Sequence, residues 1–448
     1  MKKHIYKIVL FAAVIGTFVS CEVEEFSDLN NPEVDAFENN LTRGDLQDLV
    51  GGLFYSSRVA LGTYLDDCGV IGRDYYRFSG SDPRFTNDLL GGGTTMLDNN
   101  TFYITNPWAG RYRTVKNANL ILGFLDGQDV SAQFSEAEVS ATKGLLKTYI
   151  AHELLLNLNL TDENGIRTDV ADEGNLGAFV SKTQALNDIQ AILADAASDL
   201  AAGGSDFSFF FPSGFDGFDT PATFLQVTNA IAARVAIYRG DSASALSLLD
   251  NSFLELNGDL NTGLYYDFSE AGTDLINPIF ISVAGSVPSN ARVVHPSFLT
   301  DAEADDARVT NKTEPLPNGE ITLDNLAGDT VLNLYQSNND AIPLIRNEEL
   351  ILIYAEASIT SNPANAVNAL SIVRMAAGLP AYTGPTDAAS LTTEMLKQRR
   401  YSLYGEGHRW IDVRRYGLLD TLPIDRVDTE GNPDDVWSSF PIPLTENQ

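Results

Sequence analysis

The sequence predicts a mostly α-helical protein made of antiparallel helix pairs, with two loop-rich insertions. Helix-capping signals recur along the chain, and the apolar residues that follow them fall at helical spacing. Residues 62–107 and 255–345 lack these signals and are rich in Gly, Asn, Asp and Pro. Because long loops in a compact protein are usually functional, we expect the ligand chemistry in these two regions.

The helices are delimited by their caps. Ser135 with Glu138, and Ser181 with Gln184, are capping-box patterns that open two helices. Two more begin with an N-cap residue followed by proline, at Thr220-Pro221 and Asn362-Pro363. The expected pairs are 110–126 with 135–159, 182–202 with 221–239, and 346–360 with 363–377, and a last helix covers about 390–405. Pairs of this length predict a tetratricopeptide-like superhelix, although the strict 34-residue consensus is absent.

Charge excludes one class of partner. The 448 residues include 61 acidic and 29 basic ones, for a formal net charge of −32. A nucleic-acid binder needs a basic face, so no nucleic-acid partner is expected. Residues 43–116, however, contain eight acidic and eight basic residues, and this neutral stretch leaves an anionic ligand possible.

The N-terminus predicts export and lipidation. Lys2, Lys3 and Lys7 precede an apolar run that is too short to span a bilayer, so residues 1–20 are interpreted as a signal peptide. Phe18-Val-Ser-Cys21 resembles a bacterial lipobox, in which Cys21 is acylated. Acyl chains would hold the protein on a membrane without a spanning helix. Glu22, Glu24 and Glu25 resemble the acidic signal that sends some Gram-negative lipoproteins to the cell surface, so a surface-exposed, lipid-anchored protein of the outer membrane is expected, on an acidic tether of residues 21–42.

Four further segments resemble the SusD/RagB family of outer-membrane nutrient-binding lipoproteins. The most distinctive is Leu403-Tyr-Gly-Glu-Gly-His-Arg-Trp-Ile-Asp-Val-Arg-Arg-Tyr-Gly417. The others are residues 107–120, 345–357 and 440–447. The sequence departs from the family pattern at Gln398 and Ser402, where acidic residues are usual. The resemblance implies a SusD-like domain over 43–448, with a helical scaffold at about 43–253 and 346–448 and a loop-rich insertion at about 255–345.

The same resemblance implies a function. It predicts a protein that captures oligosaccharides or polysaccharides and delivers them to a SusC-like TonB-dependent outer-membrane transporter, without catalysis and without a cofactor. Three alternatives stay open: a peptide-capturing member of the family, a helical-repeat scaffold that binds only protein, and a glycoside hydrolase.

The candidate binding site lies in a segment where aromatic, arginine and acidic residues alternate. Flat aromatic rings stack on the apolar faces of sugars, and Arg and Asp side chains hydrogen-bond to their hydroxyls. The predicted ligand-binding residues are Tyr64, Asp67, Arg73, Asp74, Tyr75, Tyr76, Arg84, Asn106 and Trp108. Trp108 could instead plug the first helix pair, and each of these aromatics could instead anchor the loop to the helices. A second aromatic patch at Phe207–Phe218 is expected to contact the transporter or to pack its own loop.

Neither a catalytic nor a metal site is indicated. The charged residues from Glu406 to Arg415 suit a packed ion-pair cluster better than an active site. His152-Glu153 lacks the second histidine of a zinc-protease helix, since position 156 is Leu156. The aspartates from Asp428 to Asp434 include Pro433 where a calcium loop of the EF-hand type needs glycine.

Overall fold

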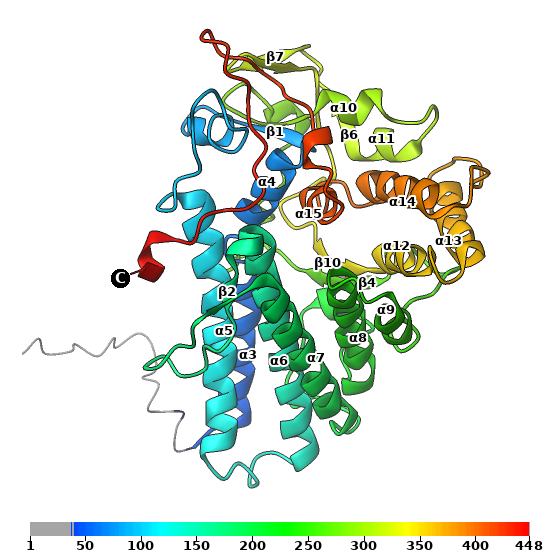
Figure 1. Cartoon of the computed structure of the whole chain (residues 1–448). Coiled ribbons are helices and arrows are strands. Elements are labelled where there is room, and N and C mark those ends of the chain that lie inside the picture. The colour runs from blue at the N-terminus through cyan, green and yellow to red at the C-terminus, as the bar shows by residue number, and fades with distance from the viewer. Residues whose placement is uncertain (1–36, 38–39, 448) are drawn as a thin grey trace, which may run out of the picture. The chain divides into compact units, whose positions relative to one another are not determined.

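The computed structural model describes residue 37 and residues 40–447, and the chain from Leu41 onward forms one compact unit (Figure 1). The predicted signal peptide, the lipidation site Cys21 and nearly all of the predicted tether lie outside the described residues. Within the described part, none of the helices is both long enough and apolar enough to cross a bilayer.

The first half of the unit is a run of antiparallel helices in which each packs on the next (Figure 1). Helix α3 (Arg43–Arg58) packs on α5 (Phe102–Gly127), which packs on α6 (Glu136–Thr161). The run continues through α7 (Lys182–Ala201), α8 (Pro221–Tyr238) and α9 (Ser242–Leu249). The predicted caps are present: Ser135 accepts from the Glu138 N–H, and Ser181 from that of Gln184.

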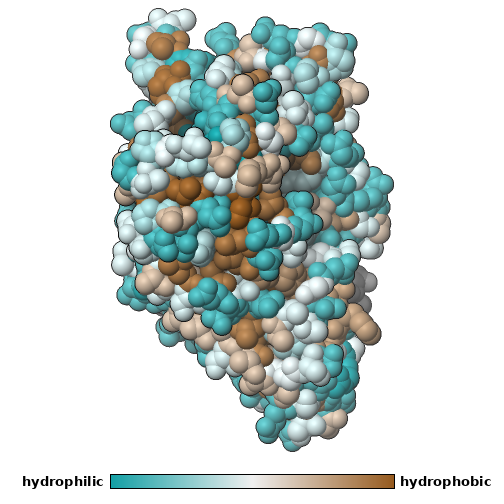
Figure 2. All heavy atoms as spheres, turned by 90° about the vertical axis from the view of Figure 1, so that its right-hand side faces the viewer, coloured by the Kyte–Doolittle hydropathy of each residue, from teal (hydrophilic) through white to brown (hydrophobic). Residues whose placement is uncertain are grey.

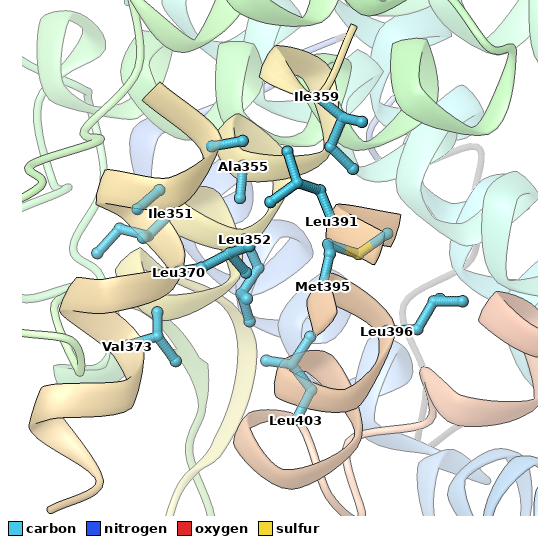
Figure 3. Close-up of a cluster of buried hydrophobic side chains, with 12 residues drawn as sticks. Ile351, Leu352, Ala355, Ile359, Leu370, Val373, Leu391, Met395, Leu396 and Leu403 are labelled. Atoms are coloured by element: carbon cyan, nitrogen blue, oxygen red, sulfur yellow. The ribbon is translucent and has the colours of Figure 1, made fainter. Parts of the chain in front are cut away.

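The second helical group follows the insertion and returns to the first. Helix α12 (Asn347–Ser358) packs on α9 and on α13 (Pro363–Ala376), and α14 (Ala388–Ser402) and α15 (Arg409–Arg415) complete the group. Twelve apolar side chains of α12, α13 and the α14 region form a buried cluster that includes Ile351, Leu370 and Met395 (Figure 3). The helical-pair architecture predicted from the sequence is therefore confirmed.

The insertion is richer in β-structure than predicted. Strands β1 (Tyr75–Ser79), β5 (Asn290–Val294), β9 (Thr330–Leu332) and β6 (Thr313–Pro315) form a four-stranded antiparallel sheet in that order. Two-stranded sheets join β4 (Gly263–Tyr266) with β10 (Ile342–Arg346) and β7 (Ile321–Leu323) with β8 (Leu326–Gly328). A further pair, β2 (Ile166–Arg167) with β3 (Phe179–Val180), lies outside the insertion, between α6 and α7. Short helices α10 (Pro296–Thr300) and α11 (Ala307–Lys312) lie between the strands. Because β1 pairs with β5, the sheet connects the predicted loop at 62–107 to the insertion.

The structure differs from the sequence prediction at the start of that loop. Residues Leu61–Ile71 form helix α4, ten of whose eleven residues are buried. Its N-cap is Ala60 in a left-handed conformation, without a side-chain cap, so the usual start signal is missing. Helix α5 likewise begins at Phe102 rather than 110 and contains Pro107 in its second turn. Tertiary packing stabilises both stretches despite weak local signals.

Polar residues cover most of one flank of the unit. Figure 2 shows this flank, which carries α13 and α14, with an apolar band at mid-height surrounded by hydrophilic side chains. Half-buried apolar residues such as Leu254, Val367 and Ile372 pack against the cluster of Figure 3.

Candidate functional site

An open cleft of about 420 Å³ lies where three loops from distant parts of the sequence meet. The loops are residues 83–95, the turn at 324–325 between β7 and β8, and residues 426–434 of the C-terminal segment. Its volume falls within the usual range for small-ligand sites. It is lined by Pro83, Asn87, Gly92, Gly93, Thr94, Thr95, Asp324, Asn325, Arg426, Val427, Asp428 and Asp434.

One wall of the cleft is a two-residue hairpin turn. Asp324 and Asn325 have φ values of +51° and +61°, and the flanking residues Leu323 and Leu326 pair across the hairpin. This is the backbone geometry of a type I′ turn, in which Asn and Asp are favoured because they tolerate positive φ. Thr86 donates its hydroxyl to Asp324 Oδ2, which fixes the turn against the first loop.

Arg426 holds the three loops together. Its Nε lies 3.0 Å and 3.2 Å from the two carboxylate oxygens of Asp434. Its Nη1 donates to the carbonyl of Asp324, and its Nη2 donates to the carbonyl of Thr86. All three guanidinium nitrogens are thus bonded to protein acceptors, so Arg426 supports the wall of the cleft.

Glycine backbone lines another part of the cleft. Gly93 has a φ of +62°, and a Cβ placed there would lie 2.9 Å from Asp428 Oδ2. A Cβ on Gly92 would lie 2.5 Å from Asn87 Oδ1. Side chains at these positions would therefore narrow the cleft, and glycine keeps it open.

A second surface adjoins the cleft at Pro83–Phe85, and we call it the Arg84–Phe102 surface. The guanidinium carbon of Arg84 lies 4.9 Å from the centroid of the Phe102 ring, and the Phe85 ring is 4.9 Å from the same ring. Arg84 Nη2 lies 2.6 Å from Asp82 Oδ2, and this pair lowers the pKa of Asp82 and raises that of Arg84. Asn106 is exposed one helical turn after Phe102. The surface therefore presents two tilted aromatic rings and a guanidinium over one of them, beside fixed hydrogen-bonding groups.

The structure separates the predicted site residues into two sets. Arg84 and Asn106 lie on the surface just described. The other seven are buried, with exposed fractions of 4% or less, and comprise Tyr64, Asp67, Arg73, Asp74, Tyr75, Tyr76 and Trp108. Their side chains lie against protein rather than solvent.

Two of the buried residues support the cleft from within. Arg73 donates to the carbonyls of Leu90 and Asp435, which joins the first loop to the C-terminal segment. Arg73 Nε also lies 3.2 Å from Asp425 Oδ2, and the Tyr76 hydroxyl donates to Asp425 Oδ1 at 2.9 Å. Asp425 immediately precedes Arg426, so these contacts fix the position of the cleft wall.

The remaining buried residues belong to the scaffold. The Tyr75 hydroxyl donates to Asp66, and Asn159 donates to the Tyr64 hydroxyl. Trp108 Nε1 donates to Glu446 at 2.8 Å, so this ring fastens the C-terminal end onto α5. Burial raises the pKa of Asp67 well above its usual value and raises that of Asp74 to about 7. The thiol of Cys68 is also buried, and its pKa is raised.

The patch at Phe207–Phe218 packs its own loop, which is one of the two predicted outcomes. Phe207, Phe209, Phe215 and Phe218 are buried, and Phe211 lies 4.9 Å from both the Phe207 and Phe215 rings. Phe210 alone in this group is largely exposed, at 86%.

The charged C-terminal block forms buried ion pairs, as predicted. Arg399 Nε lies 2.6 Å from Asp412, and Arg415 lies 2.9 Å from Glu356. Ser402, one of the two departures from the family pattern, accepts a hydrogen bond from Arg308 through its hydroxyl. In the described part of the chain, no group of three or more His, Cys, Asp or Glu residues is arranged to hold a metal ion.

Sequence reasoning missed the turn at 324–325 and the loop at 426–434 as parts of the site. A local signal exists for the turn, since Asp-Asn between two short apolar runs favours a hairpin. The signal for the loop is weaker, because Asp428–Asp434 resembles only an incomplete calcium loop. No local feature of the sequence indicates that the turn and the loop meet, since Asp324 and Arg426 are 102 positions apart.

Comparison with known proteins agrees with this architecture. The sequence model of the SusD family matches residues 328–439. A SusD superfamily protein from Bacteroides vulgatus superimposes with a TM-score of 0.65 at 15% identity, covering 91% of this chain and 97% of the other. A putative sugar-binding protein from the same species gives 0.65 at 19% identity, with 91% and 96% covered.

Surface glycan-binding protein A from Bacteroides thetaiotaomicron, solved with laminarihexaose, gives a TM-score of 0.68 at 13% identity, covering 91% of this chain and 97% of the other. No curated protein matches the sequence. The family match covers the block at 403–417 that carried the resemblance. The described chain therefore has the helical fold of the SusD superfamily, and its resemblance to the SusD/RagB family is confirmed.

Proposed function

We propose that this protein is a cell-surface glycan-binding lipoprotein that captures an oligosaccharide or polysaccharide at the cleft and the Arg84–Phe102 surface. The observation that carries the proposal is the junction of an open polar cleft with a surface of two aromatic rings and a guanidinium group packed against one of them. Two structural relatives described as sugar- or glycan-binding proteins support it.

The chemistry of the two regions suits a sugar chain. The rings of Phe85 and Phe102 are half-buried, and each leaves part of its apolar surface to stack on a pyranose ring. Asp82 and Arg84 hold each other in a fixed geometry beside these rings, which favours directed hydrogen bonds to hydroxyl groups. In the cleft, Asn87, Asp324, Asn325 and Asp428 are exposed and offer amide and carboxylate groups.

Of the nine residues predicted from the sequence, we propose that Arg84 and Asn106 contact the glycan. Arg73 and Tyr76 act indirectly, by fixing Asp425 and hence Arg426. Tyr64, Asp67, Asp74, Tyr75 and Trp108 stabilise the scaffold beneath the site.

Affinity electrophoresis against a panel of polysaccharides tests the proposal. The wild-type protein is expected to be retarded by at least one glycan, and the Arg84→Ala, Phe102→Ala and Asn106→Ala variants are expected to lose most of that retardation. Arg43→Ala is the matched control, because Arg43 also pairs with a carboxylate, Glu138, and lies over a ring, Phe134, outside the site. If no glycan retards the wild-type protein, or if the control loses binding as the variants do, the proposal is wrong.

Two further parts of the proposal concern the cell. Acylation of Cys21 would tether the protein to the outer membrane, and Cys21→Ala is expected to abolish labelling by a radioactive fatty acid and to release the protein from the membrane fraction.

We also propose that a TonB-dependent transporter receives the glycan. A transporter encoded beside this protein is expected to co-purify with it from detergent extracts. When the protein is incubated with a glycan that it binds, no new reducing ends are expected. Release of reducing ends would favour the hydrolase alternative.

A further inference from the structure

We infer that the cleft selects neutral glycans over glycans that carry carboxylate or sulfate groups. This inference rests on the proposed function and specifies its substrate class. It differs from the expectation drawn from charge counts alone, in which the balanced composition of residues 43–116 left an anionic ligand possible.

The first step is the charge of the cleft itself. Its lining residues, all in the described part of the chain, include three carboxylates, Asp324, Asp428 and Asp434, and one basic side chain, Arg426. Asp434 is buried and pairs with Arg426, whereas Asp324 and Asp428 are exposed. Hydrogen bonds from Asn432 and from neighbouring backbone N–H groups lower the pKa of Asp428, which keeps it ionised at neutral pH.

The second step is that the cationic side chains beside the cleft are already paired with carboxylates of the protein. A site for carboxylate or sulfate normally offers a guanidinium or ammonium group with free N–H donors. Each guanidinium nitrogen of Arg426 donates one hydrogen bond, to Asp434 or to the carbonyls of Asp324 and Thr86, so three of its five N–H groups are used and its charge is offset by Asp434. An anionic group in the cleft would therefore meet two exposed carboxylates, while the charge of the one basic lining residue, Arg426, is already paired with Asp434.

Three arginines of the neighbouring segment, at positions 73, 77 and 84, are also paired with carboxylates. Arg84 forms two hydrogen bonds to Asp82, at 2.8 Å and 2.6 Å. Arg77 lies 3.7 Å from Asp66 and donates to Asn290 at 2.9 Å. Arg73 is buried beneath the cleft and lies 3.2 Å from Asp425. These three arginines are thus paired with carboxylates and do not form an anion-binding surface.

The exposed carboxylates also favour neutral sugars directly, because they can accept hydrogen bonds from sugar hydroxyl groups. An exposed carboxylate accepts two hydrogen bonds from adjacent hydroxyl groups, an arrangement that a neutral pyranose offers along its edge. The exposed side chain of Val427 and the glycine backbone at Gly92 and Gly93 leave room for the apolar face of the ring.

The test compares one glycan in two charge states. A neutral polysaccharide that retards the wild-type protein is oxidised at its primary hydroxyls to carboxylates, and both forms are used in affinity electrophoresis and calorimetry. Measurements in 0.5 M NaCl reduce the Debye length to about 4 Å, which removes the long-range effect of the net charge and leaves the local one. The oxidised form is expected to bind at least tenfold more weakly.

Variants locate the effect. In Asp324→Asn/Asp428→Asn, the two exposed charges are removed while the side-chain shape is kept, and Asn tolerates the positive φ at position 324. The oxidised glycan is expected to bind this variant roughly tenfold more tightly than it binds the wild type, since each charge removed relieves repulsion at close range. Asp129→Asn is the matched control, because Asp129 also caps a turn through its carboxylate but follows the C-terminal end of α5, whereas Phe102, beside the cleft, is the first residue of that helix.

Each outcome has a distinct meaning. Tighter binding of the oxidised glycan, or best retardation by a naturally acidic polysaccharide, would overturn the neutral selectivity and leave glycan binding intact. Unchanged charge preference in the double variant would overturn the assignment to this cleft. If the protein binds neither neutral nor acidic glycans, the proposed function is wrong, and so is this inference, which rests on it.

Discussion

Arg426 and Asp434 form a partly covered ion pair across the C-terminal loop, with Nε 3.0 Å from Oδ2 and side-chain exposures of 13% and 2%. The pair closes the loop on itself, while the remaining guanidinium nitrogens reach the other two loops of the cleft. The Arg426 side chain therefore links its own loop to Thr86, which lies 340 positions earlier in the sequence. Both the shape of the cleft and the pairing of its one basic lining residue depend on this contact.

Replacing Asp434 by Asn tests that dependence. The substitution leaves the guanidinium without its ionic partner in a partly buried place, which is expected to lower the free energy of unfolding by about 2–3 kcal/mol. Urea denaturation followed by circular dichroism measures the change, with an unaltered m-value if the folded state stays compact. The freed guanidinium is also expected to strengthen binding of an oxidised glycan. A loss below about 0.5 kcal/mol would show that the pair contributes little to stability.

The cluster shown in Figure 3 predicts a contrast between two methionines. Met395 is fully buried among residues of α12, α13 and α14, whereas Met375 near the end of α13 is 55% exposed. Met395→Ala leaves a cavity and is expected to cost about 2–5 kcal/mol. Met375→Ala is expected to change stability by no more than about 0.5 kcal/mol. Equal effects in thermal denaturation would contradict the packing described for this cluster.

Asp74 predicts a pH dependence of stability. Burial raises the pKa of Asp74 from 3.8 to about 7. Between about pH 4 and 7 the folded state holds a proton that the unfolded state has lost, so this group makes the folded state less stable as the pH rises through that window. Asn at position 74 does not ionise. From pH 5 to pH 7, the stability of Asp74→Asn relative to the wild type is expected to increase by roughly 2–3 kcal/mol.

The measurement is a set of urea titrations of both proteins at pH 5, 6, 7 and 8. The difference between the two proteins isolates Asp74 from the other titrating groups, because both proteins share them. A difference that stays constant with pH would mean that Asp74 titrates normally in the folded state. A difference that changes in the opposite direction would mean that nearby arginines hold it ionised.

The helices that could be predicted from the sequence are those with their own caps. Ser135 and Ser181 form their side-chain hydrogen bonds where the pattern places them. Helix α4 has no such cap and contains Gly62 and Gly69, yet it forms because neighbouring elements bury it: a Cβ at Gly69 would lie 2.6 Å from the Tyr75 ring. Information of this kind lies in contacts between segments and not in the local sequence.

The same distinction applies to the candidate site. Of the residues predicted for it, Arg84 and Asn106 lie on the surface, where a ligand has access to them. Tyr75 and Arg73 have the same residue types, but they lie in a sheet strand and in the turn before it, and the fold buries both. Composition gives the kind of side chain available, whereas exposure depends on which segments pack over it.

Two glycines with different surroundings give opposite predictions. Gly52 is exposed in the middle of α3, and a Cβ there would meet no atom within 4 Å, so Gly52→Ala is expected to raise the free energy of unfolding by about 0.5–1 kcal/mol. Gly93 has a φ of +62° beside Asp428, so Gly93→Ala is expected to cost about 1–2 kcal/mol from its left-handed backbone.

The two variants also differ in what they do to the cleft. The new methyl group at position 93 would press on Asp428, whose Oδ2 accepts from Asn432 at 2.9 Å, and so would displace a carboxylate that we propose contacts the glycan. Gly93→Ala is therefore expected to weaken glycan retardation, while Gly52→Ala leaves it unchanged. Because Gly52→Ala adds the same methyl group away from the cleft, it controls for the substitution itself. Retention of full binding by a destabilised Gly93→Ala would separate the cleft from ligand recognition and point to the Arg84–Phe102 surface alone.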